Sequence, residues 1–148
     1  MWKLSAPDRL EQWKRFRKEI DKLEFEPALD RVAQFWGSAP FQPFYLESQQ
    51  PETWPDPWTL IVENCYCDLA KALGILYTLH LSDHETHDYS LVVMRQQGTR
   101  YQYNLVWIDG GKYVLNLETA EVVNKKSIPD NLVKIIEYTK HELNLDRF

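Results

Sequence analysis

The sequence predicts an α+β fold, in which a central buried helix packs on an antiparallel sheet of four or five strands. Two patterns support this prediction. Apolar residues recur every three or four positions before residue 75 and again after residue 127, as they do on the buried face of a helix. Between residues 89 and 124, short β-branched and aromatic runs alternate with turn-forming residues, which is typical of consecutive hairpins. N-terminal helices and a C-terminal helix are expected to flank this core.

Two helices are expected within residues 1–37. The first begins at a capping-box sequence, Ser5 to Asp8, with a proline in its first turn. The second begins near Pro27 and ends at Gly37, because glycine commonly terminates helices. The predicted buried faces carry Leu10, Trp13, Phe16, Ile20 and Leu23 in the first helix, and Leu29, Val32, Ala33 and Trp36 in the second.

Residues 38–57 combine closely spaced prolines with aromatic residues. Proline at this density excludes a regular helix or a central strand, and the aromatic content argues against a disordered linker. We therefore expect an extended segment packed on the domain surface, with rigid rings that could anchor a protein partner. The candidate binding residues in and beside this segment are Phe41, Phe44, Tyr45, Trp54 and Trp58.

The central helix is expected to begin at Asp56 and Pro57, which are a favourable N-cap and first helical residue. Apolar residues then follow at helical spacing, and Gly74 is expected to end the helix. Residues 75–81 have a β-like composition, and residues 82–88 are polar enough to form a loop.

Four strands are expected after this loop, at residues 89–95, 100–108, 112–117 and 121–124. The connections at 96–99 and 109–111 contain glycine and have the composition of hairpin turns. The region 127–148 is expected to form a final helix that begins at a second capping box. Its predicted inner face consists of Leu132, Ile135, Ile136, Thr139 and Leu143.

Composition narrows the possible functions. The 148 residues suffice for one globular domain spanning 1–148. The formal net charge is −5 and no basic stripe is present, so a nucleic-acid partner is not expected. No apolar run approaches the roughly 18 residues of a membrane span. Cys65 and Cys67 are too close for an unstrained disulfide, which favours free thiols in a reducing compartment such as the cytoplasm. No cofactor is expected.

The middle of the chain resembles the core of the transglutaminase-like superfamily, which has a papain-like fold. The segment from Lys71 to Ile75 is similar to the end of the family's buried helix, and residues 104–107 and 109–116 are similar to its strand pair. The resemblance covers roughly residues 57–123 and implies a core at 58–124. In this family a nucleophilic cysteine begins the helix, and a histidine and an aspartate lie on the two strands.

The resemblance implies that the catalytic residues of the family are replaced in this chain. The positions that match the cysteine, the histidine and the aspartate are Thr59, Asn104 and Asn116. Asparagine has no nitrogen that titrates near neutral pH, and threonine without a base is a poor nucleophile. The leading hypothesis is a non-catalytic transglutaminase-like domain that serves as a protein-interaction or structural module.

The proline- and aromatic-rich segment and the chain as a whole also resemble short proteins encoded by tailed bacteriophages. This second resemblance implies a phage component, located in the host cytoplasm or in the virion. Its partners would then be other virion proteins or host proteins.

The enzymatic alternative is a cysteine-dependent amidase or acyltransferase that uses Cys65 or Cys67 as nucleophile and His87 as base. On the predicted helix, Cys65 lies on the apolar stripe, where a packing role is favoured, and Cys67 lies about 200° away from it. His87 is explained more simply as an ordinary loop residue. The spacing of these cysteines and histidines does not match common zinc sites, so no metal is expected.

Overall fold

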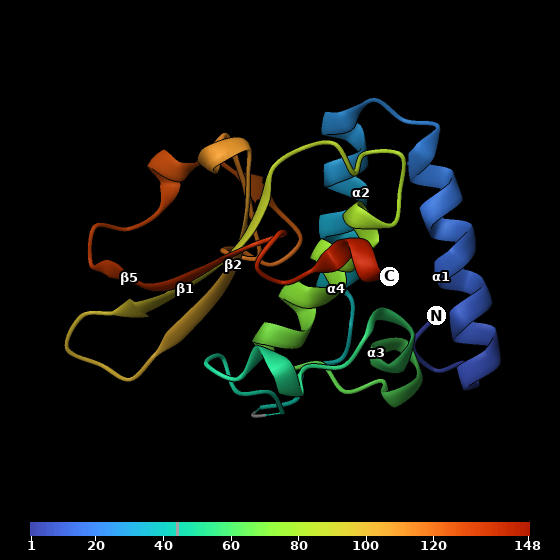
Figure 1. The fold of residues 1–148 in the computed structure, drawn as a ribbon, viewed down its shortest axis with the longest axis horizontal. Helices are drawn as coiled ribbons and strands as arrows, with labels where there is room; N and C mark the ends of the chain where they lie inside the picture. Colours follow the sequence, from blue (N-terminus) through green and yellow to red (C-terminus); the bar gives the residue numbers. More distant parts are fainter. Residues whose placement is uncertain (44) are drawn as a thin grey trace.

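The computed structural model describes residues 1–43 and 45–148 and confirms the α+β fold. The described residues form four α-helices and one five-stranded antiparallel sheet. The helices occupy one side of the molecule and the sheet the other (Figure 1). Helix α4 (Asp68–His80) connects the two parts, since it contacts strands of the sheet as well as two of the other helices.

The two N-terminal helices are confirmed as α1 (Ala6–Asp21) and α2 (Phe25–Gly37). Ser5 occupies the N-cap position of α1, but its side chain makes no capping hydrogen bond. None of the helices formed by residues 1–43 and 45–148 is long and apolar enough to cross a bilayer. The fully or nearly buried side chains include Trp13, Phe16 and Ile20 of α1, and Leu29, Val32 and Trp36 of α2.

The prediction of a single central helix is wrong, because the chain forms two helices between residues 57 and 80. Asp56 caps α3 (Pro57–Glu63), and its side chain accepts a hydrogen bond from the Thr59 N–H. Asn64 ends α3 in the left-handed conformation with φ 55°, which asparagine tolerates better than most residues. The second helix, α4, begins only at Asp68.

Helix α4 also continues past Gly74 to His80, so the strand expected at 75–81 is wrong. Residues 72–80 are all buried, and a fully buried helix lacks the periodicity that distinguishes it from a buried strand. Gly74 does not end the helix. A Cβ at this position would lie 2.5 Å from the ring of Trp36, so glycine is required for the close approach of α2 to α4.

The four strands expected between residues 89 and 124 are confirmed, the first one residue longer than expected and the other three shorter. The sheet has the order β4-β3-β2-β1-β5, and every neighbouring pair is antiparallel. Strand β3 pairs with only the last three residues of β2. The strands are β1 (Tyr89–Gln96), β2 (Gln102–Ile108), β3 (Tyr113–Leu115), β4 (Val122–Val123) and β5 (Leu132–Thr139).

The C-terminal helix expected over 127–148 is wrong, because its central part is strand β5, paired along β1. A bulge between Val93 and Met94 shifts the register, so Ile136 pairs with Val93 and Lys134 with Met94. The extra residue, Ile135, breaks the two-residue alternation of a regular strand. The apolar spacing therefore resembles that of a helix, although the residues pair as a strand.

A buried hydroxyl joins three helices at the centre of the core. Thr78 of α4 accepts hydrogen bonds from the indole N–H groups of Trp13 and Trp36, at 3.0 and 2.9 Å. The same hydroxyl donates to the carbonyl of Gly74 at 2.6 Å. Because both indoles are 1% exposed, they have no access to water as an alternative acceptor.

We expect Thr78→Val to lower the free energy of unfolding by about 1–3 kcal/mol, because it leaves two buried donors without an acceptor. Thr78→Ser is the matched control, since it keeps the hydroxyl and loses only one methyl group, worth about 0.8 kcal/mol. Urea denaturation of the three proteins measures both values. A valine variant as stable as the serine variant would contradict the role of the hydroxyl.

Candidate functional site

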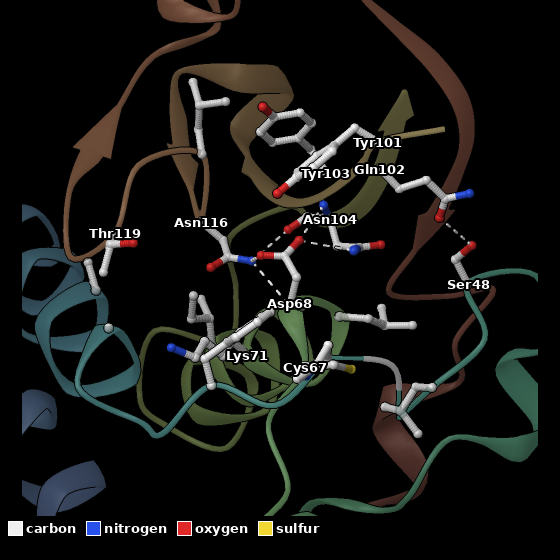
Figure 2. Close-up of a pocket in the computed structure, with 18 of the residues that line it drawn as sticks. Ser48, Cys67, Asp68, Lys71, Tyr101, Gln102, Tyr103, Asn104, Asn116 and Thr119 are labelled. Atoms are coloured by element: carbon white, nitrogen blue, oxygen red, sulfur yellow. Dashed lines mark hydrogen bonds between the residues drawn. The ribbon is translucent and has the colours of Figure 1, made fainter. Parts of the chain in front are cut away.

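A pocket of about 880 Å³ opens where the N-terminus of α4 meets β2 and the chain that follows β3. Figure 2 shows its polar floor and walls. Strand β3 ends before it reaches the first half of β2, which leaves that half of β2 free to line the pocket. The lining residues used below are Phe41, Glu47, Ser48, Cys67, Asp68, Lys71, Tyr101, Gln102, Tyr103, Asn104, Asn116 and Thr119.

The floor of the pocket is a hydrogen-bonded cluster of Asp68, Asn104 and Asn116. Asp68 Oδ2 accepts from the backbone N–H of Asn104 at 2.9 Å and from its Nδ2 at 3.0 Å. Asn116 Nδ2 donates to Asp68 Oδ1 at 3.2 Å and to the Asn104 carbonyl at 2.8 Å. One helix terminus, one strand and one turn are therefore fixed to each other by side chains.

Local structure explains why these three side chains converge. Asp68 lies in the first turn of α4, where the helix dipole favours a negative charge. Asn104 lies on β2 opposite Val93. Asn116 directly follows β3 with φ 70°, a left-handed conformation that asparagine adopts more readily than most residues. This turn ends β3 and directs the Asn116 side chain toward Asp68 (Figure 2).

The electrostatics of the floor are dominated by burial. Burial raises the pKa of the Asp68 carboxyl above its usual range, although hydrogen bonds from Asn104 and Asn116 and the nearby Lys71 oppose this shift. Burial likewise lowers the pKa of Lys71, against the opposing effect of Asp68. Within the described part of the chain, no group of three or more His, Cys, Asp or Glu side chains is placed to hold a metal ion.

Of the three positions taken from the family resemblance, the structure brings Asn104 and Asn116 together but not Thr59. Thr59 lies on α3, outside the described lining of the pocket, and the residue that joins the two asparagines is Asp68. The match of Thr59 to the cysteine position rests on one continuous helix from Asp56 to Gly74, and the break between α3 and α4 removes that basis. Asp68 itself is the sequence signal for a helix that starts at this point, because acidic residues are favoured in the first turn of a helix.

The structure does not assemble the alternative site of cysteine and His87. Cys67 is the buried N-cap residue of α4 and lines the pocket, whereas Cys65 is half-buried and contacts the Glu63 carbonyl. Neither cysteine lies within a helix, so the predicted helical angle between them is wrong.

His87 lies outside the described lining of the pocket and has other partners. It precedes β1, whose first residue pairs with Ile108, whereas Asn104 pairs four residues further along β1. The Nδ1 atom of His87 is 2.8 Å from Asp109 Oδ2, and its ring stacks on Phe25 with centroids 3.6 Å apart. These contacts account for His87 as a residue that holds α2 against the sheet.

The expected aromatic binding surface divides into exposed and packed residues. Phe41 is 66% exposed and lines the pocket, and Trp58 is 43% exposed on α3. Trp54 is buried against Tyr138, and Tyr45 packs against the core, so both are structural rather than available anchors. Phe44 lies outside the described residues.

Comparison with known proteins gives a structural match without a sequence match. No protein-family model matches this sequence, and no curated protein matches it. The fold is similar to that of Legionella pneumophila LapG, with a TM-score of 0.69 and 14% identity over 90% of this chain and 75% of LapG. The calcium-bound form of LapG gives a TM-score of 0.70 and 12% identity over 92% of this chain and 77% of LapG. The chain therefore shares the overall fold of LapG.

The raised pKa of Asp68 predicts a pH-dependent cost to folding. Between the unfolded pKa, about 3.9, and the higher folded value, the native state binds the proton more tightly than the unfolded chain. The stability contributed by this residue therefore falls as the pH rises through that interval.

Asp68→Asn lacks this titration. Relative to that variant, the wild type should lose unfolding free energy as the pH rises through the interval, and the difference between the two proteins should become constant above it. Urea denaturation at several pH values between 4 and 8 measures this difference. A difference that shifts in favour of the wild type with rising pH would show that the folded pKa is instead lowered.

Proposed function

We propose that this chain is a non-catalytic transglutaminase-like domain that binds another protein through the pocket at the start of α4. The observation that carries the proposal is the Asp68, Asn104 and Asn116 cluster. It occupies the helix start and the two strand positions where the resemblance implies a cysteine, a histidine and an aspartate. The chemistry of the three groups differs from that of a catalytic triad in each place.

The cluster cannot perform the proton transfers of a cysteine-dependent enzyme. The amides of Asn104 and Asn116 neither take up nor release a proton near neutral pH. The Asp68 carboxylate accepts hydrogen bonds from both asparagines, so it acts as the acceptor that orders the cluster. No histidine is among the described residues that line the pocket. The pairing of a thiol with a histidine base, on which such enzymes depend, is therefore not formed by this lining.

One observation favours the enzymatic alternative, a cysteine-dependent amidase or acyltransferase. Cys67 lies at the N-cap of α4 and lines the pocket, and helix N-termini are where reactive thiols are found. Against this alternative, Cys67 is only 6% exposed and His87 is engaged with Asp109 at the other end of β1. The thiol thus lacks both access and a base.

A binding role is supported by the rim of the pocket. Phe41 and Tyr101, which are 66% and 68% exposed, both line this pocket, and aromatic side chains are common anchors in protein interfaces. We further propose that the partner is a virion or host protein and that the chain functions in the host cytoplasm or the virion. The resemblance to short proteins of tailed bacteriophages supports this setting.

The proposal predicts that both native thiols react with iodoacetamide slowly, and at a rate that rises between pH 6 and pH 8 as for an ordinary thiol. Mass spectrometry of the labelled native protein resolves Cys65 from Cys67. Cys67→Ser is the matched control that identifies the labelled site. Rapid labelling of Cys67 already at pH 6 would refute the non-catalytic proposal.

If the cluster occupies the positions of a triad, rebuilding the triad should restore thiol activation. We expect Asp68→Cys combined with Asn104→His and Asn116→Asp to give a thiol that iodoacetamide labels at pH 6 about tenfold or more faster than the thiol of Asp68→Cys alone. The single variant is the matched control. Equal labelling of two folded variants would count against the equivalence of the positions.

A further inference from the structure

The direction of the asparagine amides determines which chemical groups the pocket floor offers to a ligand. Asp68 accepts hydrogen bonds from Asn104 Nδ2 and Asn116 Nδ2. A carboxylate cannot donate, so both amides must turn their nitrogen atoms toward Asp68. Both amide oxygens consequently face away from the carboxylate, and the floor presents acceptors to the pocket.

One of these acceptors is left without a partner. Asn104 is 6% exposed, and its Oδ1 atom is buried with no hydrogen bond from the protein. An unpartnered buried acceptor is unfavourable, and a ligand that donates a hydrogen bond would relieve this cost. The amide cannot relieve it by rotating, because rotation would place its oxygen against the Asp68 carboxylate.

The acceptor-rich side of the pocket is separate from its lysine. Figure 2 shows Asn104 Oδ1 directed toward the side where Gln102 and Ser48 lie, while the Lys71 amino group points to the Thr119 side. The Ser48 hydroxyl already donates to Gln102 Oε1 at 3.0 Å, so its hydrogen is engaged. Glu47, which precedes Ser48, adds an exposed carboxylate to the lining, and Arg100, two residues before Gln102, adds a second cation besides Lys71.

Aromatic rings stand at the mouth of the pocket. Tyr101 and Tyr103 lie 5.9 Å apart between ring centroids, and exposed Phe41 lines another part of the rim. Such rings pack against the aliphatic part of a long side chain and attract a cation through their faces.

We propose that the pocket binds a basic side chain, a lysine or an arginine of a partner protein, whose donors reach Asn104 Oδ1 and the acidic wall at Glu47. The inference rests on the proposed function, because it names the chemistry by which the non-catalytic domain recognises its partner. The formal net charge of −5 favours a basic partner over an acidic one.

The test uses ¹⁵N-labelled full-length protein and the peptide acetyl-Gly-Lys-Gly-amide, with norleucine and glutamate peptides as comparisons. We expect saturable shifts of the Asn104 and Asn116 side-chain amide signals with the lysine peptide, and weaker binding as salt is raised. Equal shifts with norleucine, preference for glutamate, or no shift with lysine would each overturn the proposal.

Variants locate the site. Glu47→Gln should weaken binding of the lysine peptide about two- to fivefold, as expected for a partly exposed charge pair, whereas Glu52→Gln, the same change outside the described pocket lining, should not. Asp68→Asn should weaken it about tenfold or more, because it removes the charge and the order of both amides. Equal effects of the Glu47 and Glu52 variants would overturn the assignment to this wall.

The same samples separate the two proposals. Mass spectrometry of the peptide and the protein after incubation detects cleavage or a new amide bond. Binding without any product supports both proposals. Binding followed by product would retain the lysine site and refute the non-catalytic function.

Discussion

The carboxylate of Asp68 is the contact on which the arrangement of the pocket depends. It begins α4, accepts from the backbone and side chain of Asn104 on β2, and holds Asn116 at the end of β3. Three segments that are distant in the sequence thus meet at one acidic group. The energetic cost of burying this carboxylate is visible in its raised pKa, and the hydrogen bonds from the asparagines offset part of that cost.

The hydrogen bonds of this cluster are arranged differently from those of a catalytic triad. A catalytic triad passes a proton along a chain of groups that alternately donate and accept, with a titratable ring in the middle. Here both amides of the cluster donate to one central acceptor, and neither changes its protonation state near neutral pH. Helix α4, β2 and the end of β3 meet at this cluster, and the two amides that complete it are hydrogen-bonding groups that do not titrate near neutral pH.

The sequence was sufficient for features that depend on neighbouring residues. Hairpin turns with glycine predict the first strands well, and Asn104 lies on β2 as expected, whereas Asn116 lies one residue beyond the end of β3. Features that depend on tertiary contacts were missed. Strand β5 was taken for a helix because its bulge disturbs the alternation, and the wholly buried face of α4 concealed its period.

The site was only partly predictable for the same reason. Asn64 ends the helix capped by Asp56 with a backbone conformation that apolar spacing does not reveal, and a second helix begins at Asp68. The resemblance therefore places the nucleophile position at Thr59 on α3, whereas the two asparagines meet the start of α4. Gly74 was similarly interpreted as a helix end, whereas its role is to admit the ring of Trp36.

The bulge of β5 also bears on how readily the border of the sheet can pair with another chain. Strand β5 forms one border of the sheet, and a regular border strand offers unpaired backbone groups to any passing chain. The bulge twists this border, and Lys134 and Glu137 place a charged pair along it at 2.8 Å. A twisted, charged border is a poor template for further strands. These two features are among the devices by which sheet borders disfavour pairing with another chain.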